Sequence, residues 1–474
     1  LLPEFRGAVD LDSLPHYTLN ATLDLERVTI SGEQTVRFVN PARVPLDTAV
    51  FRLLANASTI YAGGTLTVDQ VTRDGQAATW ELSPDRTVLT VALEPAAATG
   101  EWVEIGMTFE TRIPTDYQGY GILHHSTAVT SLSGWYPVLS PFDGTWDVSP
   151  VPQVGDGNHL PTAIYDVALD APATHMLVST GETLRTTQDG ARRVWRVASG
   201  PARGFTAVLS DRFQLYTESV DGVEVNYYAL PSASTRSPRE ALQFATDSLA
   251  VFNERFGPYP YGELDLVETL VSVGGYEFAG MVAIEQSIRT QASVSQLRFM
   301  VSHEVAHQWW FALVGSDPVE EPWLDESLAT YAVVLYLEEV YGAATANAMI
   351  SLYWQEGGRP DGSSPGIDVS ALDYSSWAAY RGPVYYRGAL FLDALRDELG
   401  DETFYEFLRS YATAHRFGIA STADLAAAAE EAANRELDTL FALWFGTPEP
   451  GSPATGTQGS GLVQDAGAAT DSEG

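Results

Sequence analysis

The sequence contains neither cysteine nor lysine among its 474 residues. Without cysteine there is no disulfide framework, no thiol nucleophile and no Cys-ligated zinc, so histidine and carboxylate side chains would have to hold any metal. All 26 basic residues are arginine, and 62 acidic residues bring the formal net charge to −36. Such a negative chain repels phosphate backbones, which argues against a nucleic-acid partner.

Long hydrophobic runs are also missing. No uninterrupted apolar segment approaches the ~20 residues needed to cross a bilayer, so we expect no membrane span. The chain begins with Leu1 rather than Met and carries no basic-then-apolar leader, as a processed product would. This slightly favours a secreted or cell-surface location over the cytoplasm. The oligomeric state is left open, and a monomer is compatible with the sequence.

Apolar residues nevertheless make up 45% of the chain, which is enough to bury in about two or three domains of ordinary size. Up to Arg212 the pattern is one of short strands, in which residues such as Tyr17, Leu19 and Ala21 alternate with polar neighbours. Turn pairs such as Gly63-Gly64 separate these strands. We therefore predict a β-rich, mostly antiparallel N-terminal domain over residues 1–214.

Helical spacing dominates from residue 215 to 446. Ser237 is suited to cap a helix and Pro238 to begin it, and Gly257 can end the same helix. We predict a mainly α second domain over 215–446. Residues 447–474 are mostly Gly, Ser, Thr, Ala, Pro and acids with little to bury, and we predict an acidic, disordered tail.

Two of only eight histidines, His303 and His307, lie four residues apart. Ser293 with Gln296 can form a capping box and Gly315 can end the segment, which predicts a helix of about five turns. On a helix both imidazoles share one face, and Glu304 leans toward the same cleft. The pattern predicts a metal site of the HExxH type. The alternative is a buried helix whose two histidines are only hydrogen-bonded.

A catalytic zinc site needs a third protein ligand and an open position for water. Glu326 follows His307 after 18 intervening residues, a length that allows the chain to reverse and a second helix, ending at Gly342, to bring Glu326 back. We predict one Zn²⁺ per chain, held by His303, His307 and Glu326. Glu304 would take a proton from the zinc-bound water and deliver it to the leaving amine.

Three nearby acids are candidates to fix the tautomer of a ligand histidine, with solvent exposure as the alternative. They are Glu320, Glu321 and Asp325.

The segment His303 to Trp310, followed by Trp323-Leu324-Asp325-Glu326-Ser327, resembles the aminopeptidase N family of gluzincin metallopeptidases. The resemblance covers about residues 1–446 and implies a saddle-like β domain before a thermolysin-like catalytic domain. It implies a short form, because the large helical C-terminal domain of many members is missing.

In that family a Gly-x-Met-Glu-Asn strand binds the free α-ammonium group of the substrate through its Glu. The matching residues here are Gly274, Gly275, Tyr276, Glu277 and Phe278. The resemblance therefore implies Glu277 as the ammonium anchor, with Tyr276 reshaping the pocket for the first side chain of the substrate. A solvent-exposed edge-strand Glu is the alternative. The Gln or Glu with which the family's β domain assists this anchor is not evident before Trp135-Tyr136-Pro137.

The family also carries a Tyr, in a Tyr-x-Lys/Arg-Gly context, that donates a hydrogen bond to the developing oxyanion. Tyr385-Tyr386-Arg387-Gly388 matches, which implies Tyr385, with Tyr386 and Tyr380 as alternatives. The resemblance thus implies a zinc aminopeptidase that acts on peptides. A zinc endopeptidase of the same fold and a non-catalytic peptide-binding scaffold are the rival hypotheses.

Overall fold

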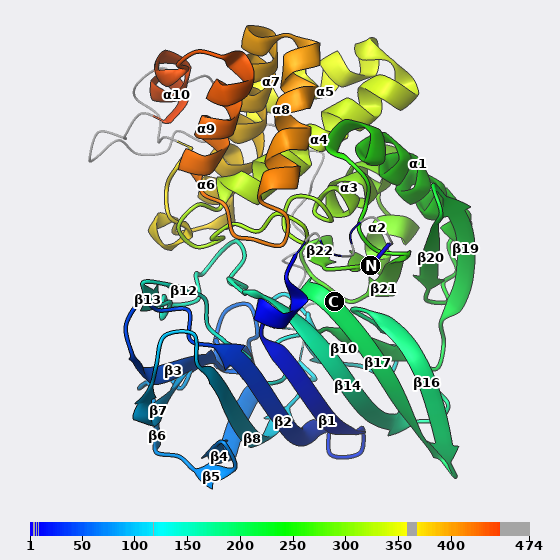
Figure 1. Cartoon of the computed structure of the whole chain (residues 1–474). Helices are drawn as coiled ribbons and strands as arrows, with labels where there is room; N and C mark the ends of the chain where they lie inside the picture. The colour runs from blue at the N-terminus through cyan, green and yellow to red at the C-terminus, as the bar shows by residue number, and fades with distance from the viewer. Residues whose placement is uncertain (3–4, 6, 8, 117, 358–366, 446–474) are drawn as a thin grey trace.

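A computed structural model describes residues 1–2, 5, 7, 9–116, 118–357 and 367–445 of the chain. The predicted tail over 447–474 lies outside these residues. Strands of the first 210 residues form the lower part of the molecule in Figure 1, and helices form the upper part. This order of a β-rich region before a helical region confirms the predicted fold class. The division at residue 214 stays a prediction.

The largest sheet has eight strands and is antiparallel except where β1 pairs with β14. The alternation of apolar and polar residues predicted from Tyr17 onward is present in the first strand, where every second side chain is buried. In order across the sheet the strands are β16 (Glu182–Asp189), β17 (Arg192–Arg203), β14 (Thr162–Pro172), β1 (His16–Asp24), β2 (Thr29–Val39), β8 (Trp102–Arg112), β4 (Thr65–Arg73) and β5 (Gln76–Ala77).

Smaller sheets pack with it around one apolar core, which includes the fully buried Trp135. One consists of β15 (Met176–Ser179), β18 (Ala207–Ser210), β10 (Thr130–Leu132) and β9 (Leu123–His125), and another of β11 (Val138–Leu139), β3 (Leu46–Arg52), β7 (Val88–Ala97) and β6 (Trp80–Leu82). A short pair, β12 (Phe142–Asp143) with β13 (Thr145–Trp146), and the 3₁₀ turns η2 (Leu11–Ser13) and η3 (Leu54–Asn56) complete this region.

A five-stranded mixed sheet begins the second region. Its order is β19 (Gln214–Val220), β20 (Val223–Ala229), β21 (Glu263–Thr269), β23 (Met281–Glu285) and β22 (Gly275–Phe278). Helix α1 (Pro238–Phe256) packs against β19 and β20, and Ser237 caps it by accepting the Arg239 N–H as the sequence predicts. Strand β22, which carries most of the Gly-Gly-Tyr-Glu motif, lies at the edge of this sheet and contacts the helix that carries His303 and Glu304.

The remaining helices cover this sheet and each other. They are α2 (Gln286–Thr290), α3 (Val294–Ala306), α4 (Trp323–Tyr341), α5 (Ala343–Gly357), α6 (Trp377–Arg381), α7 (Gly388–Leu399), α8 (Asp401–Ala414), α9 (Thr422–Ala433) and α10 (Asp438–Phe445), with the 3₁₀ turn η4 (Ala371–Asp373) and the π-helical turn η5 (Gly382–Arg387). The capping box of Ser293 with Gln296 is present at the start of α3, and Gly342 ends α4 as predicted.

Helix α3 is shorter than predicted. It ends at Ala306, not near Gly315, because the N–H groups of Gln308 and Trp309 bond three residues back and tighten the last turn. The Gln308 side chain explains this turn: its amide bonds the Phe278 carbonyl and the Gly280 N–H, which ties the helix end to β22.

Within the described ranges, none of the helices combines the length and the apolar character needed to span a membrane.

Candidate metal centre and active site

Helices α3 and α4 bring the three predicted metal ligands together. The Nε2 atom of His303 lies 3.2 Å from Oε2 of Glu326, and Nε2 of His307 lies 3.4 Å from the same oxygen. The two Nε2 atoms are themselves 3.2 Å apart. All three side chains are at least nine-tenths buried. Two imidazoles and a carboxylate therefore converge on one point inside the protein.

The Nδ1 atom of His307 lies 2.9 Å from the carbonyl oxygen of Trp310. A carbonyl only accepts hydrogen bonds, so Nδ1 carries the hydrogen and Nε2 is the nitrogen that can offer a lone pair to a metal. A backbone carbonyl, rather than one of the three acids considered from sequence, orients this ring. Asp325 instead accepts the Glu326 N–H, and Glu321 accepts the Thr422 N–H, while Glu320 is exposed.

Glu304 lies beside this cluster on α3 and is 4% exposed. Burial raises the pKa of its carboxyl to about 8; the nearby His307 lowers it, and the charges of Glu326 and Asp156 raise it further. Gly275 on β22 lies directly against Glu304, and a Cβ atom at this position would overlap the Glu304 carboxyl. The close approach of β22 to α3 thus places Glu304 between the metal cluster and the Gly-Gly-Tyr-Glu strand.

Glu277 is buried as well, with 5% exposure, so the alternative of a solvent-exposed edge-strand residue is wrong. Ligand-type atoms of Glu277, Glu304 and His307 lie within 4.8 Å of one another. Gly274 makes the preceding turn with φ of 94°, a conformation that favours glycine. The Tyr276 hydroxyl accepts a hydrogen bond from Asn158 of the β region at 2.8 Å.

Sequence reasoning missed Asp156, which comes from the β region and lies against Glu277. Burial raises the pKa of Asp156 to about 6, as does the Glu326 charge, whereas hydrogen bonds with Tyr276 and Glu277 and the nearby His307 lower it. Two carboxyl groups from two different regions therefore face each other next to the metal cluster. The family pattern places an assisting residue before Trp135, whereas Asp156 follows that motif, in the Gly155-Asp156-Gly157 segment.

Of the three tyrosines considered, Tyr385 is the one in contact with the cluster. Its hydroxyl donates to Oε1 of Glu326, and its ring stacks on His303 with centroids 5.8 Å apart. Tyr386 instead stacks on Tyr353 at 5.2 Å in the helical core. The Tyr380 hydroxyl packs where Gly155 leaves room for it, and burial, followed by the charges of Glu326 and Asp156, raises its pKa.

The cluster fits a dication by charge as well as by ligand type. Charges of neighbouring carboxyl groups affect the pKa values of Asp156, Glu277, Glu304 and His307. Burial lowers the pKa of His307, yet its hydrogen bond to Glu326 and the charges of Glu277 and Glu304 hold it well above its ordinary value. In addition, the pKa of Glu326 is held at about 2: burial opposes this, but hydrogen bonds with both histidines outweigh it. A proton on His307 balances charge that a bound metal would balance instead.

Comparison with known protein families finds a match in the helical region. Residues 240–444 match the family described as "Peptidase family M1 domain". Among curated proteins, "Aminopeptidase N" of Streptomyces lividans is 27% identical over 248 residues, which cover 49% of this chain and 29% of that protein. "Aminopeptidase M1-A" of Oryza sativa subsp. japonica is 26% identical over 308 residues, which cover 61% and 34%. The chain thus spans about a third of the length of these relatives.

Among solved structures, the M1 zinc metallopeptidase from Deinococcus radiodurans has a TM-score of 0.70 at 21% identity, covering 92% of this chain and 95% of its own. A mutant of that enzyme bound to a Tyr-Ser-Ala substrate has a TM-score of 0.69 at 20% identity, with the same coverage. These likenesses concern the fold alone: over 92% of its length, which includes the β-rich region, the chain has the same fold as that solved structure.

Proposed function

We propose that this chain, whose residues 240–444 match the peptidase family M1 domain, is a zinc-dependent aminopeptidase that removes N-terminal residues from peptides. The proposal rests on one observation: two groups of side chains with different chemical roles lie together in one buried site. A His₂Glu set suited to catalytic zinc adjoins Glu304, and a pair of carboxyls suited to an ammonium group adjoins both.

His303, His307 and Glu326 would hold the metal. When bound there, zinc supplies a Lewis acid that polarises the scissile carbonyl and lowers the pKa of a water molecule. The rest of the mechanism belongs to side chains of this chain. Tyr385 keeps its hydroxyl directed at the cluster, where it can donate to a carbonyl oxygen that becomes negative.

Glu304 is the proton carrier in this account. Its Oε2 atom is buried and has no hydrogen-bond partner among the described residues, so this oxygen is available to bond to a substrate or water that enters the site. With a pKa of about 8 it can take a proton and return it to the leaving amine near neutral pH.

Glu277 and Asp156 would bind the free ammonium group of the substrate. An approaching cation favours the ionised form of both carboxyls, so that two negative charges face one positive charge in a buried site. This arrangement favours peptides with a free N-terminus and so supports an exopeptidase over an endopeptidase.

The test is hydrolysis of a panel of aminoacyl fluorogenic substrates, each free and N-acetylated, by the zinc-loaded protein and by Glu277→Gln. We expect cleavage of the free-amine set only, and its loss in the variant. Equal cleavage of acetylated substrates would favour the endopeptidase. No cleavage of any substrate, including longer peptides, would favour the peptide-binding scaffold. Secretion or cell-surface display stays a prediction that fractionation of the source cells would test.

A further inference from the structure

A cavity of about 580 Å³ lies between the β region and the five-stranded sheet, away from the metal cluster. Strands β14, β16 and β17 contribute one wall, and β20, β21 and the turn after β22 contribute the other. None of the metal-site residues described above lines it. Its volume and its position between two structural units are those of typical small-molecule sites.

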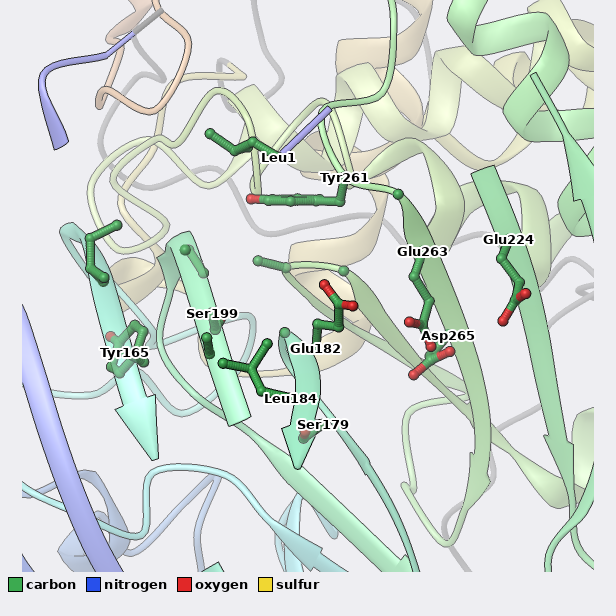
Figure 2. A pocket seen from close by; sticks show the side chains of 18 of the residues that line it. Leu1, Tyr165, Ser179, Glu182, Leu184, Ser199, Glu224, Tyr261, Glu263 and Asp265 are labelled. Carbon is green, nitrogen blue, oxygen red and sulfur yellow. The ribbon is translucent and has the colours of Figure 1, made fainter. Parts of the chain in front are cut away.

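The charged side chains described in the lining of this cavity are all acidic. Four acidic side chains line it, from Glu182, Glu224, Glu263 and Asp265, and among the described residues no lining side chain is basic. Figure 2 shows Glu263 and Asp265 on one strand and Glu224 on the neighbouring strand, with Glu182 across from them. A cavity with this lining repels anions and attracts cations.

Three of these acids come together because of strand register. In the parallel pairing of β20 with β21, Glu224 lies opposite Glu263, and Asn226 lies opposite Asp265. The alternate residues Val225 and Leu264 point into the helical core, so the acids share the other face, toward the cavity. Like charges opposite each other destabilise a sheet, so this arrangement has a cost in the absence of a compensating cation.

The protein supplies too few donors to these acids. The side-chain amide nitrogen of Asn226 lies 3.3 Å from Glu224, 3.1 Å from Glu263 and 3.2 Å from Asp265. An amide offers only two hydrogens, so it cannot donate to all three acids at once. Asp265 is 5% exposed, and its burial and the neighbouring Glu263 raise its pKa well above the ordinary value.

The opposite side of the cavity is suited to an apolar body. In Figure 2 the ring of Tyr261 lies above Glu182 and to the left of Glu263, and its hydroxyl is already used in a 2.6 Å hydrogen bond to the Pro201 carbonyl. Leu184 and Ile164 add aliphatic surface to the lining. An aromatic face next to carboxylates is a favourable setting for an ammonium or guanidinium group.

We propose that this cavity is a second binding site, separate from the metal centre, for an organic cation that carries an amine or guanidine group on an apolar body. The acids on β20 and β21 would bind the cationic group, and Tyr261 with Leu184 would contact the apolar part. The proposal does not depend on peptidase activity.

Calorimetric titration of the full chain tests it, with agmatine as a free cation and an N-acetylated, C-amidated arginyl peptide as a source of the same group. We expect one molecule per chain for at least one probe, and the probe that binds identifies the source. In Glu263→Gln/Asp265→Asn the affinity should fall about tenfold or more, as expected for loss of charged hydrogen bonds.

A second pair of variants avoids the buried acids. Leu184 is 66% exposed at the cavity, and Leu184→Arg would place an internal guanidinium there to compete with the probe. Leu215→Arg makes the same change of charge on β19, at a residue that is 47% exposed and outside the lining. We expect loss of affinity in the first and unchanged affinity in the second and in Glu277→Gln. Absence of binding by both probes, binding unaffected by the cavity variants, or binding abolished only by Glu277→Gln would overturn the proposal.

Discussion

Replacing Asp156 by Asn tests the part of the site that the β region contributes. The carboxyl is 9% exposed and hydrogen-bonded with Glu277, so its position is fixed before a substrate arrives. Asn retains the size and the hydrogen-bonding capacity but cannot become negative. The variant therefore removes one of two charges facing the substrate ammonium group without leaving a hole in the interface.

The size of the effect follows from the loss of one charge-assisted hydrogen bond in a buried site, about 1.5 to 3 kcal/mol. This corresponds to a decrease in kcat/KM of about 10- to 150-fold for substrates with a free N-terminus. The unfolding midpoint should not fall, because the pKa of Asp156 is already raised to about 6 by burial and the Glu326 charge, so folding disfavours its ionised form.

The assay compares kcat/KM of aminoacyl substrates for wild type, Asp156→Asn and Glu277→Gln, with zinc content measured in each. Asp143→Asn, an exposed residue of the same region, is the matched control and should behave as wild type. The double variant should lose less than the product of the two single losses, because both carboxyls bind one group. A value for Asp156→Asn within about twofold of wild type, a change too small to match a lost charged hydrogen bond, would refute the reasoning.

Two further predictions concern the oxyanion donor and acid stability. Tyr385→Phe should lower kcat about 100-fold or more with little change in KM, because its hydroxyl serves the transition state; steady-state kinetics measure this, and Tyr386→Phe is the control. Burial raises the pKa of Asp147, but hydrogen bonds from His159 and Ser149 outweigh it and hold the pKa well below its ordinary range. The ionised Asp147 therefore stabilises the fold above the unfolded pKa of about 3.9, and this stabilisation is lost as the pH falls toward the folded pKa. We expect Asp147→Asn to lower the free energy of unfolding by about 1 to 3 kcal/mol at pH 7 and by less at pH 3, as measured by urea unfolding.

Each of these has a contradicting result. A Tyr385→Phe variant that raises KM while kcat stays unchanged would make the hydroxyl a substrate-binding group instead. An Asp147→Asn variant whose destabilisation is the same at pH 7 and pH 3 would show that the carboxyl charge is not what stabilises the contact with His159.

The metal ligands could be predicted because local spacing determines their geometry. Four residues on a helix place His303 and His307 on one face, and 18 residues suffice for a return on a second helix that carries Glu326. Their function as zinc ligands remains a prediction. The end of α3 could not be predicted, because it depends on bonds from Gln308 to Phe278 and Gly280, which are distant in sequence.

Asp156 and the acids of the interface cavity were missed for the same physical reason. Their significance arises from tertiary neighbours: Asp156 meets Glu277 across two regions, and Glu224 meets Glu263 through strand register. In the sequence each is one acid among 62, and composition explains most of them as surface charge. The glycines flanking Asp156 were the one local signal, since they allow a tight segment against Tyr380.

The central claim is that Glu304 transfers protons at a zinc centre held by its three neighbours. The direct test measures zinc content and aminoacyl-substrate hydrolysis in wild type and Glu304→Gln side by side. The account predicts one zinc per chain in both proteins and a fall in kcat of about 100- to 10,000-fold in the variant, the usual contribution of general acid–base catalysis. Equal zinc content with undiminished hydrolysis would contradict it, as would a wild-type protein that hydrolyses these substrates without bound metal.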